Sequence, residues 1–196
     1  MNDLSKITFE GQNFRQSINY CNQLLSKFPD SNFAPNADYR IGQNYLNLDQ
    51  VLQAENHYRS MLSKSPAEQY SDFAKLGLAR VAMARNSYID GITYVDEVLN
   101  NRNDELAAEA QFLKGELAYN RENFQEAGLN YLKVKYLFQQ YPYWVVQSVY
   151  GAGLSYEKAN QKTEAIKLFR SLLQNFPDTQ FAILARDHIE LITGNK

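Results

Sequence analysis

The feature that most constrains this chain is a phrase that it contains twice, LLSKFPDSNFA at 24–34 and LLQNFPDTQFA at 172–182. The prolines of the two phrases, Pro29 and Pro177, are 148 residues apart, which is four steps of 37 residues. The residues at or near the intermediate steps are Pro66, Asn103 and Pro142. A period in the middle thirties indicates an array of helical hairpins, each of which is one repeat.

A second set of spaced residues repeats in the same phase. Two copies share the spacings 3, 9, 4 and 8; they are Gly42, Tyr45, Ala54, Tyr58 and Pro66, and Gly153, Tyr156, Ala165, Phe169 and Pro177. Weaker copies contain Gly115, Ala127 and Tyr131, then Ala79, Gly91 and Val95, and then Ser17, Cys21 and Pro29. The small residues let two antiparallel helices approach closely, and the aromatic residue fills the gap to the neighbouring hairpin. Proline ends each second helix because it cannot continue one, and in the copy around Tyr131 we interpret Pro142 as this proline, three residues late.

This pattern resembles the tetratricopeptide repeat over nearly the whole chain. The resemblance implies an all-α fold, a right-handed α-α superhelix of helical hairpins followed by a C-terminal capping helix. We expect a single array over 1–196, with repeats at approximately 1–30, 31–67, 68–103, 104–142 and 143–178 and a capping helix at 179–193. The expected helices are 2–9, 13–28, 34–47, 51–64, 69–85, 88–100, 104–120, 124–140, 143–159, 162–175 and 179–193. Turns between them carry EGQN, NLDQ, RNSY, NREN and ANQK.

The two ends of the expected array differ. The N-terminus enters in mid-hairpin without a cap, although terminal repeats normally present a polar outer face. We therefore expect the chain to be a fragment of a longer protein, and self-association through the uncapped N-terminal edge stays open. The start, MNDLSKITFE, has no apolar signal region, so a signal or lipid anchor would have to lie outside this chain.

Composition excludes several classes of function. A net charge of −2 and a pI near 5.7 argue against a general nucleic-acid binder, which needs a basic surface. No stretch approaches the roughly 18 apolar residues of a membrane span, so we expect no direct membrane insertion by this chain. The only cysteine, Cys21, allows no internal disulfide and is interpreted as a small buried hydrophobic residue.

No set of residues in the sequence predicts catalysis. The two histidines, His57 and His188, are more than a hundred residues apart, and neither has a metal-ligand spacing with Cys21 or a carboxylate. We interpret both as structural or surface residues. The sequence therefore predicts a protein that is not an enzyme and that holds no metal or cofactor.

The resemblance also implies where a partner protein or peptide would bind, because the first helix of each hairpin lines a concave groove in such arrays. The predicted groove residues are Tyr39, Gln43, Leu46, Leu76, Arg80, Met83, Phe112, Glu116, Tyr119, Tyr150, Leu154 and Glu157. Tyrosine and arginine often carry binding energy at interfaces. The alternative is that these tyrosines only pack between neighbouring helices. The Lys and Asn clamp of chaperone-cofactor domains is replaced here, so we do not expect binding of chaperone tails.

A second candidate contact is the aromatic stretch QQYPYWVV at 139–146. It contains Tyr141, Tyr143 and the only tryptophan, Trp144. Trp144 either seals the junction between two hairpins or forms an exposed contact, and the sequence leaves both interpretations open.

The phrase FPDSNFAPNADYRIGQNYLNL at 28–48 resembles a bacterial envelope subset of these repeats. That subset includes the outer-membrane-assembly lipoproteins and the periplasmic partner of the Tol–Pal system. The resemblance implies a non-catalytic scaffold in cell-envelope assembly or maintenance, located in the periplasm or envelope if a signal or lipid anchor precedes this fragment and in the cytoplasm otherwise. The alternative is a regulatory or targeting module of a larger cytoplasmic enzyme or sensor protein.

Overall fold

A computed structural model describes residues 13–64 and 68–194, and this part of the chain forms ten α-helices and no strand. In chain order the helices are α2 (Phe14–Lys27), α3 (Ala34–Asn47), α4 (Val51–Lys64), α5 (Glu68–Ala84), α6 (Tyr88–Asn101), α7 (Glu105–Asn120), α8 (Phe124–Leu137), α9 (Pro142–Lys158), α10 (Lys162–Asn175) and α11 (Gln180–Thr193). The predicted all-α class is confirmed. The helix predicted at 2–9 and the expected helix stop at Pro66 lie outside the described residues.

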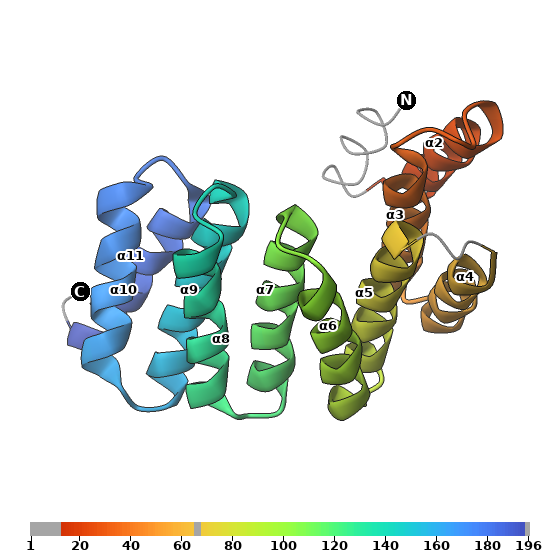
Figure 1. The fold of residues 1–196 in the computed structure, drawn as a ribbon. Coiled ribbons are helices and arrows are strands. Elements are labelled where there is room, and N and C mark those ends of the chain that lie inside the picture. The colour runs from red at the N-terminus through yellow and green to blue at the C-terminus, as the bar shows by residue number, and fades with distance from the viewer. Residues whose placement is uncertain (1–12, 65–67, 195–196) are drawn as a thin grey trace. The chain divides into compact units, whose positions relative to one another are not determined.

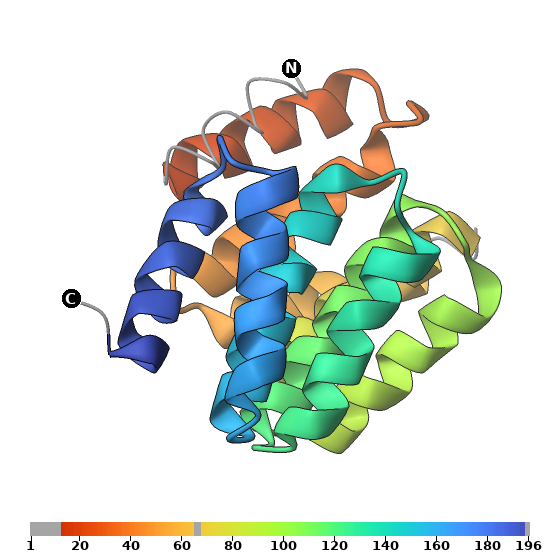
Figure 2. The same cartoon turned by 90° about the vertical axis from the view of Figure 1, so that its left-hand side faces the viewer.

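The chain divides into two compact units, Met1–Val98 and Leu99–Lys196. In the first unit α2 packs on α3, α3 packs on both α4 and α5, and α4 packs on α5. In the second unit α7 to α10 each pack on the next helix in the chain, and α9 also contacts both α7 and α11 (Figures 1 and 2). Each helix is therefore covered mainly by its near neighbours in sequence, as expected of hairpin repeats.

The four tight turns inside the hairpins share one backbone conformation. Each contains a residue in the left-handed region, with φ between 58° and 60°, and these residues are Asp49, Asn86, Glu122 and Asn160. The next residue closes the turn; the N–H of Gln50, for example, donates to the carbonyl oxygen of Tyr45 at 2.8 Å. Backbone N–H groups of such a turn donate hydrogen bonds to the last carbonyl groups of the helix, which have no partner within the helix. The predicted turns NLDQ, RNSY, NREN and ANQK are confirmed.

Three second helices end on a phenylalanine. The N–H groups of Phe28, Phe138 and Phe176 donate to the carbonyl oxygens four residues earlier, at 2.8, 3.0 and 2.9 Å. Helix α8 therefore ends at Leu137, and the prediction that it reaches residue 140 is wrong. Pro142 is also not a late copy of Pro29, because it is the first residue of α9. A backbone N–H at that position would have no partner within the helix, so proline is well tolerated there.

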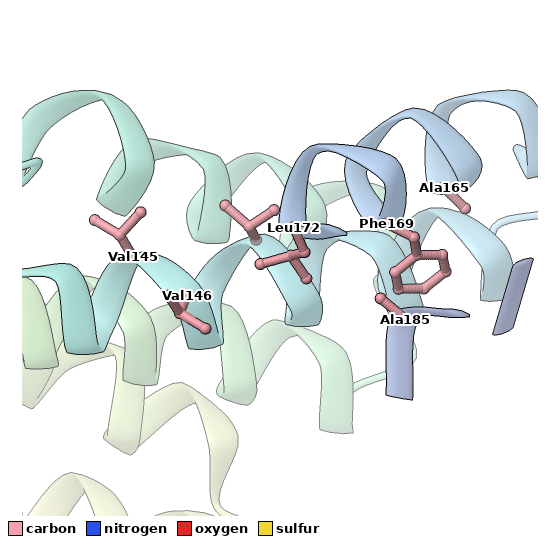
Figure 3. Packing of buried hydrophobic residues seen from close by; sticks show 7 residues of the cluster. Val145, Val146, Ala165, Phe169, Leu172 and Ala185 are labelled. Atoms are coloured by element: carbon pink, nitrogen blue, oxygen red, sulfur yellow. The ribbon is translucent and has the colours of Figure 1, made fainter. Parts of the chain in front are cut away.

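The aromatic residue of each repeat lies where helices cross. Tyr131 is buried, and a Cβ added to Gly115 in its own hairpin would lie 2.6 Å from the ring. A Cβ added to Gly151 in the next hairpin would lie 2.9 Å from the same ring. In the last hairpin, Figure 3 shows Phe169 of α10 beside Ala185 of α11, within a buried cluster that α9 completes. The aromatic position thus joins its own hairpin to the next helix, as the spacing predicts.

Candidate functional site

The predicted groove residues of the first unit lie in two different environments. Tyr39 and Leu76 are buried, with 3% and 0% of their surface exposed. The Tyr39 ring packs on Phe73 with centroids 5.4 Å apart, and its hydroxyl accepts a hydrogen bond from Nε of Arg80 at 3.1 Å. Helix α3 is covered by both α4 and α5, which places Tyr39 in the core rather than on a partner-binding surface. The remaining four, Gln43, Leu46, Arg80 and Met83, are half-buried.

The six predicted residues of the second unit are all half-buried. They form what we call the α7–α9 row, which consists of Phe112, Glu116, Tyr119, Tyr150, Leu154 and Glu157. On both helices the spacing is i, i+4 and i+7, which places the three residues of each helix on one face. Because α7 and α9 contact each other, the row combines aromatic, aliphatic and acidic side chains from two successive first helices.

Glu157 interacts with three polar side chains at this row, those of His188, Tyr119 and Tyr150. Its carboxylate is 2.8 Å from Nδ1 of His188 on α11. Burial raises the pKa of Tyr119, and the charge of Glu157 raises it further. Burial also raises the pKa of Tyr150, with Glu157 and then Asp187 adding to the effect. Both tyrosines therefore stay neutral hydrogen-bonding groups beside fixed negative charge.

His188 also lies beside this row, although the sequence predicted only a structural or surface role for it. Its ring stacks on Phe169 at a centroid distance of 5.2 Å and meets Tyr150 edge-on at 5.9 Å. It lies on α11, after the last complete copy of the repeat, so no repeat position pointed to it. The other histidine, His57, is also packed structurally, with Nε2 2.9 Å from the backbone oxygen of Asp38.

The aromatic stretch at the start of α9 separates into buried and exposed residues. Trp144 is half-buried, with its ring 5.5 Å from Phe112, and Tyr141 packs on the same cluster. Tyr143 meets Trp144 edge-on and is 66% exposed. The packing favours the sealing interpretation for Trp144 and leaves Tyr143 as the accessible aromatic residue.

A pocket of about 440 Å³ lies on α8, where sequence reasoning predicted no site. Its apolar wall includes Leu129 and Tyr136, which are exposed although they lie on a second helix. The sequence signal for this pocket was the apolar type of these two residues, because the same repeat positions hold polar residues in α4 and α10.

Cys21 is buried, as predicted. Over residues 13–64 and 68–194, no group of three or more His, Cys, Asp or Glu side chains is arranged to hold a metal ion, and none of the helices is long and apolar enough to cross a membrane.

Two family models match the chain. Residues 5–141 match a tetratricopeptide repeat-like domain, and residues 147–179 match a tetratricopeptide repeat. No curated protein sequence gives a significant match.

Three solved structures of similar fold are distant in sequence. A thermophilic TPR protein from Thermus thermophilus is 14% identical with a TM-score of 0.72, and the match covers 96% of both chains. A tetratricopeptide repeat protein from Parabacteroides merdae is 14% identical with a TM-score of 0.62, over 98% of this chain and 72% of the other. YrrB, described as a TPR protein with an unusual peptide-binding site, is 16% identical with a TM-score of 0.57, over 95% of this chain and 90% of its own. These similarities show the fold.

Proposed function

Because this chain belongs to the tetratricopeptide repeat family, we propose that it is a non-catalytic scaffold that binds a segment of a partner protein on the α7–α9 row. Tetratricopeptide repeats are generally protein–protein interaction scaffolds, and the distant relative YrrB is described as having a peptide-binding site. The observation that carries the proposal is the row itself, six half-buried side chains that repeat with one spacing on two neighbouring first helices.

The chemistry of the row defines the kind of segment that would fit. Phe112, Tyr119 and Tyr150 offer aromatic faces for an apolar side chain, and aromatic residues often carry binding energy. Glu116 and Glu157 favour a lysine or arginine on the same segment through charge complementarity. The segment is therefore an extended or helical peptide that combines an apolar residue with a basic one.

A random peptide library displayed on phage tests this proposal with the full chain as bait. Enriched peptides should contain an apolar and a basic residue, and Glu157→Lys should weaken their binding about tenfold, because it replaces attraction by repulsion. Glu164→Lys is the matched control, since it makes the same charge change on exposed surface of α10. Because Glu157 also pairs with His188, Glu157→Gln is the gentler second variant, with an expected loss of about threefold.

The site proposal fails if no peptide that combines an apolar and a basic residue is enriched. It also fails if such peptides bind the two Glu157 variants as tightly as the original chain, with thermal denaturation showing that both variants fold.

The proposal extends to a role in the bacterial cell envelope, which the phrase at 28–48 supports through its resemblance to envelope repeats. Cell fractionation of the native organism with an antibody against this chain tests the location. Recovery with the envelope fraction supports the role. Recovery in the cytoplasm, on a polypeptide that also carries a kinase or transferase domain, supports the regulatory-module alternative instead.

A further inference from the structure

The pocket on α8 combines exposed apolar side chains with lysines. Leu129 and Tyr136 of its wall are 58% and 63% exposed, and the adjacent Leu137 is 64% exposed. They lie at i, i+7 and i+8 on one helix, which places them on a single face. A helix face open to water normally carries polar residues, so three large apolar side chains together mark an interaction surface.

The repeat itself supplies a control for this observation. The position of Leu129, two residues after the small Ala127, holds Asn56 in α4 and Lys167 in α10. The position of Tyr136 holds Ser63 and Gln174 in those two helices. All four of these residues are polar and exposed. The hairpin fold therefore does not require apolar residues at these positions, and their presence on α8 needs another reason.

The charged groups around the pocket are mainly positive. Lys133 is exposed on the same face of α8, and Lys114 of α7 lines the pocket from the other side. Nζ of Lys135 lies 5.6 Å from the centroid of the Tyr136 ring. The one carboxylate in the lining, Glu126, already accepts a hydrogen bond from Nδ2 of Asn123 at 2.6 Å. The pocket thus presents an apolar wall with a basic rim.

We infer that this pocket is a second docking site, distinct from the α7–α9 row, for an acidic amphipathic segment of a protein partner. An aliphatic or aromatic side chain of the segment fills the pocket against Leu129 and Tyr136. Aspartate or glutamate residues on either side of it meet Lys114 and Lys133. Apolar anchor residues hold an amphipathic helix on a hydrophobic groove, and complementary charges around the groove select which segment binds. Opposite charge preferences at the two sites allow the chain to distinguish two partner segments.

The same phage-displayed random library, selected on the full chain, tests this inference separately from the proposed function. A class of enriched peptides should carry Asp or Glu on both sides of a large apolar residue. Synthetic members of this class should lose about tenfold in affinity, measured by fluorescence anisotropy, when Lys133→Glu or Leu129→Asp is introduced. Lys167→Glu is the matched control, because it reverses the same charge one hairpin later, and it should change the affinity less than about twofold. Glu157→Lys should likewise leave this class unaffected.

Three results would overturn the inference. One is a library that yields no acidic class. Another is an acidic class that binds Lys133→Glu and Leu129→Asp as well as it binds the original chain. The third is occupancy of the pocket only by a non-protein amphiphile, tested with sodium laurate as competitor and as direct ligand. If the basic peptides lose affinity for Glu157→Lys and the acidic peptides keep theirs for Lys133→Glu and Leu129→Asp, the α7–α9 row is supported and the pocket is not. If only the acidic peptides lose affinity for their variants, the pocket alone is supported.

Discussion

Tyr58 in the first unit and Phe169 in the second occupy the same repeat position, and both are fully buried. Tyr58 lies between two glycines, Gly42 of its own hairpin and Gly77 of the next helix, and a Cβ added to either would overlap its ring. Its hydroxyl donates to the carbonyl oxygen of Tyr39 at 3.2 Å. The ring is therefore held between two stretches of backbone, and the neighbouring Tyr39 ring, 5.9 Å away, is itself buried.

Phe169 also packs on a glycine of its own hairpin, Gly153, but side chains surround the rest of its ring. His188 stacks on it with an interplanar angle of 23°, and the Tyr150 ring lies 5.9 Å away. Side chains can rotate into a space that opens beside them, whereas helix backbone at a glycine cannot. One sequence pattern thus produces two junctions that differ in their capacity to relax.

Removing the two rings should give the largest effects and separate the two junctions. Tyr58→Ala should lower the free energy of unfolding by about 4 kcal/mol, because the cavity lies between glycines that cannot fill it. Phe169→Ala should cost less, about 3 kcal/mol, because His188 and Tyr150 can move into the space. Urea denaturation followed by circular dichroism measures both values. An equal loss in the two variants would show that the side chains around Phe169 do not relax.

Adding one methyl group to a glycine beside the Tyr58 ring tests the same contact by overpacking it instead of emptying it. Gly42→Ala should destabilise the protein by about 2 kcal/mol, because overpacking against the buried Tyr58 exceeds the gain in helix propensity. Gly128→Ala is the matched control, since its Cβ would lie 3.0 Å from the ring of the half-buried Tyr156, where a small shift of the ring suffices. We expect a change of less than about 0.5 kcal/mol for this control. A neutral Gly42→Ala variant would contradict the tight packing assigned to Tyr58.

The sequence was sufficient to predict most helix boundaries because the signals that set them are local. A residue that tolerates the left-handed conformation marks three of the four turns, at Asp49, Asn86 and Asn160. Proline or an N-capping residue marks several helix starts. Pro142 was misassigned because proline suits both the residue after a helix and the first turn of the next helix. The recurring Phe28, Phe138 and Phe176 distinguish the two cases, since each ends a helix in the structure.

The candidate site was predictable only in part, because exposure depends on contacts that are distant in sequence. Periodicity places Tyr39 and Tyr150 at the same repeat position, yet only Tyr150 stays half-exposed. An aromatic ring packs on each tyrosine at a centroid distance of 5.4 Å, Phe73 on Tyr39 and Phe181 on Tyr150. The difference is that α5 makes a more extensive contact with α3 than α11 makes with α9. The pocket on α8 was missed although the sequence contained a signal, since Leu129 and Tyr136 occupy repeat positions that hold polar residues in α4 and α10.

Helix starts extend the comparison of the two units and give smaller effects. Both units contain capped and uncapped helix starts. In the first unit Asn13 caps α2, whereas α3 starts without a side-chain cap. In the second unit α8, α9 and α10 have no side-chain cap, whereas Asp104 and Thr179 accept hydrogen bonds from the N–H groups of Ala107 and Ala182, at 3.4 and 3.3 Å. Asp104→Ala and Thr179→Ala should each cost about 1 kcal/mol near neutral pH.

The two caps should respond differently to acid. The hydrogen bond from Arg102 is the main cause that lowers the pKa of Asp104 below its ordinary value. Its stabilisation is therefore complete above its unfolded pKa of about 4 and is lost as the pH falls through the lower folded value. The cost of Asp104→Ala should fade in acid, while that of Thr179→Ala, which has no titrating group, should persist. Urea titrations at pH values on both sides of about 4 measure this, and parallel pH profiles would contradict the role of the carboxylate.

The turns should give the smallest effect, and here the second unit contains the exception. Asp49, Asn86 and Asn160 are residue types that tolerate the left-handed conformation, whereas Glu122 adopts it at a φ of 60° with a longer side chain that gains no local hydrogen-bonding advantage from it. Glu122→Asn should therefore stabilise the protein by about 0.5 kcal/mol, and Asn160→Glu should destabilise it by a similar amount. Thermal denaturation of the two variants measures both changes in stability. Shifts of the same sign would mean that surface charge, rather than backbone conformation, determines the residue at this turn.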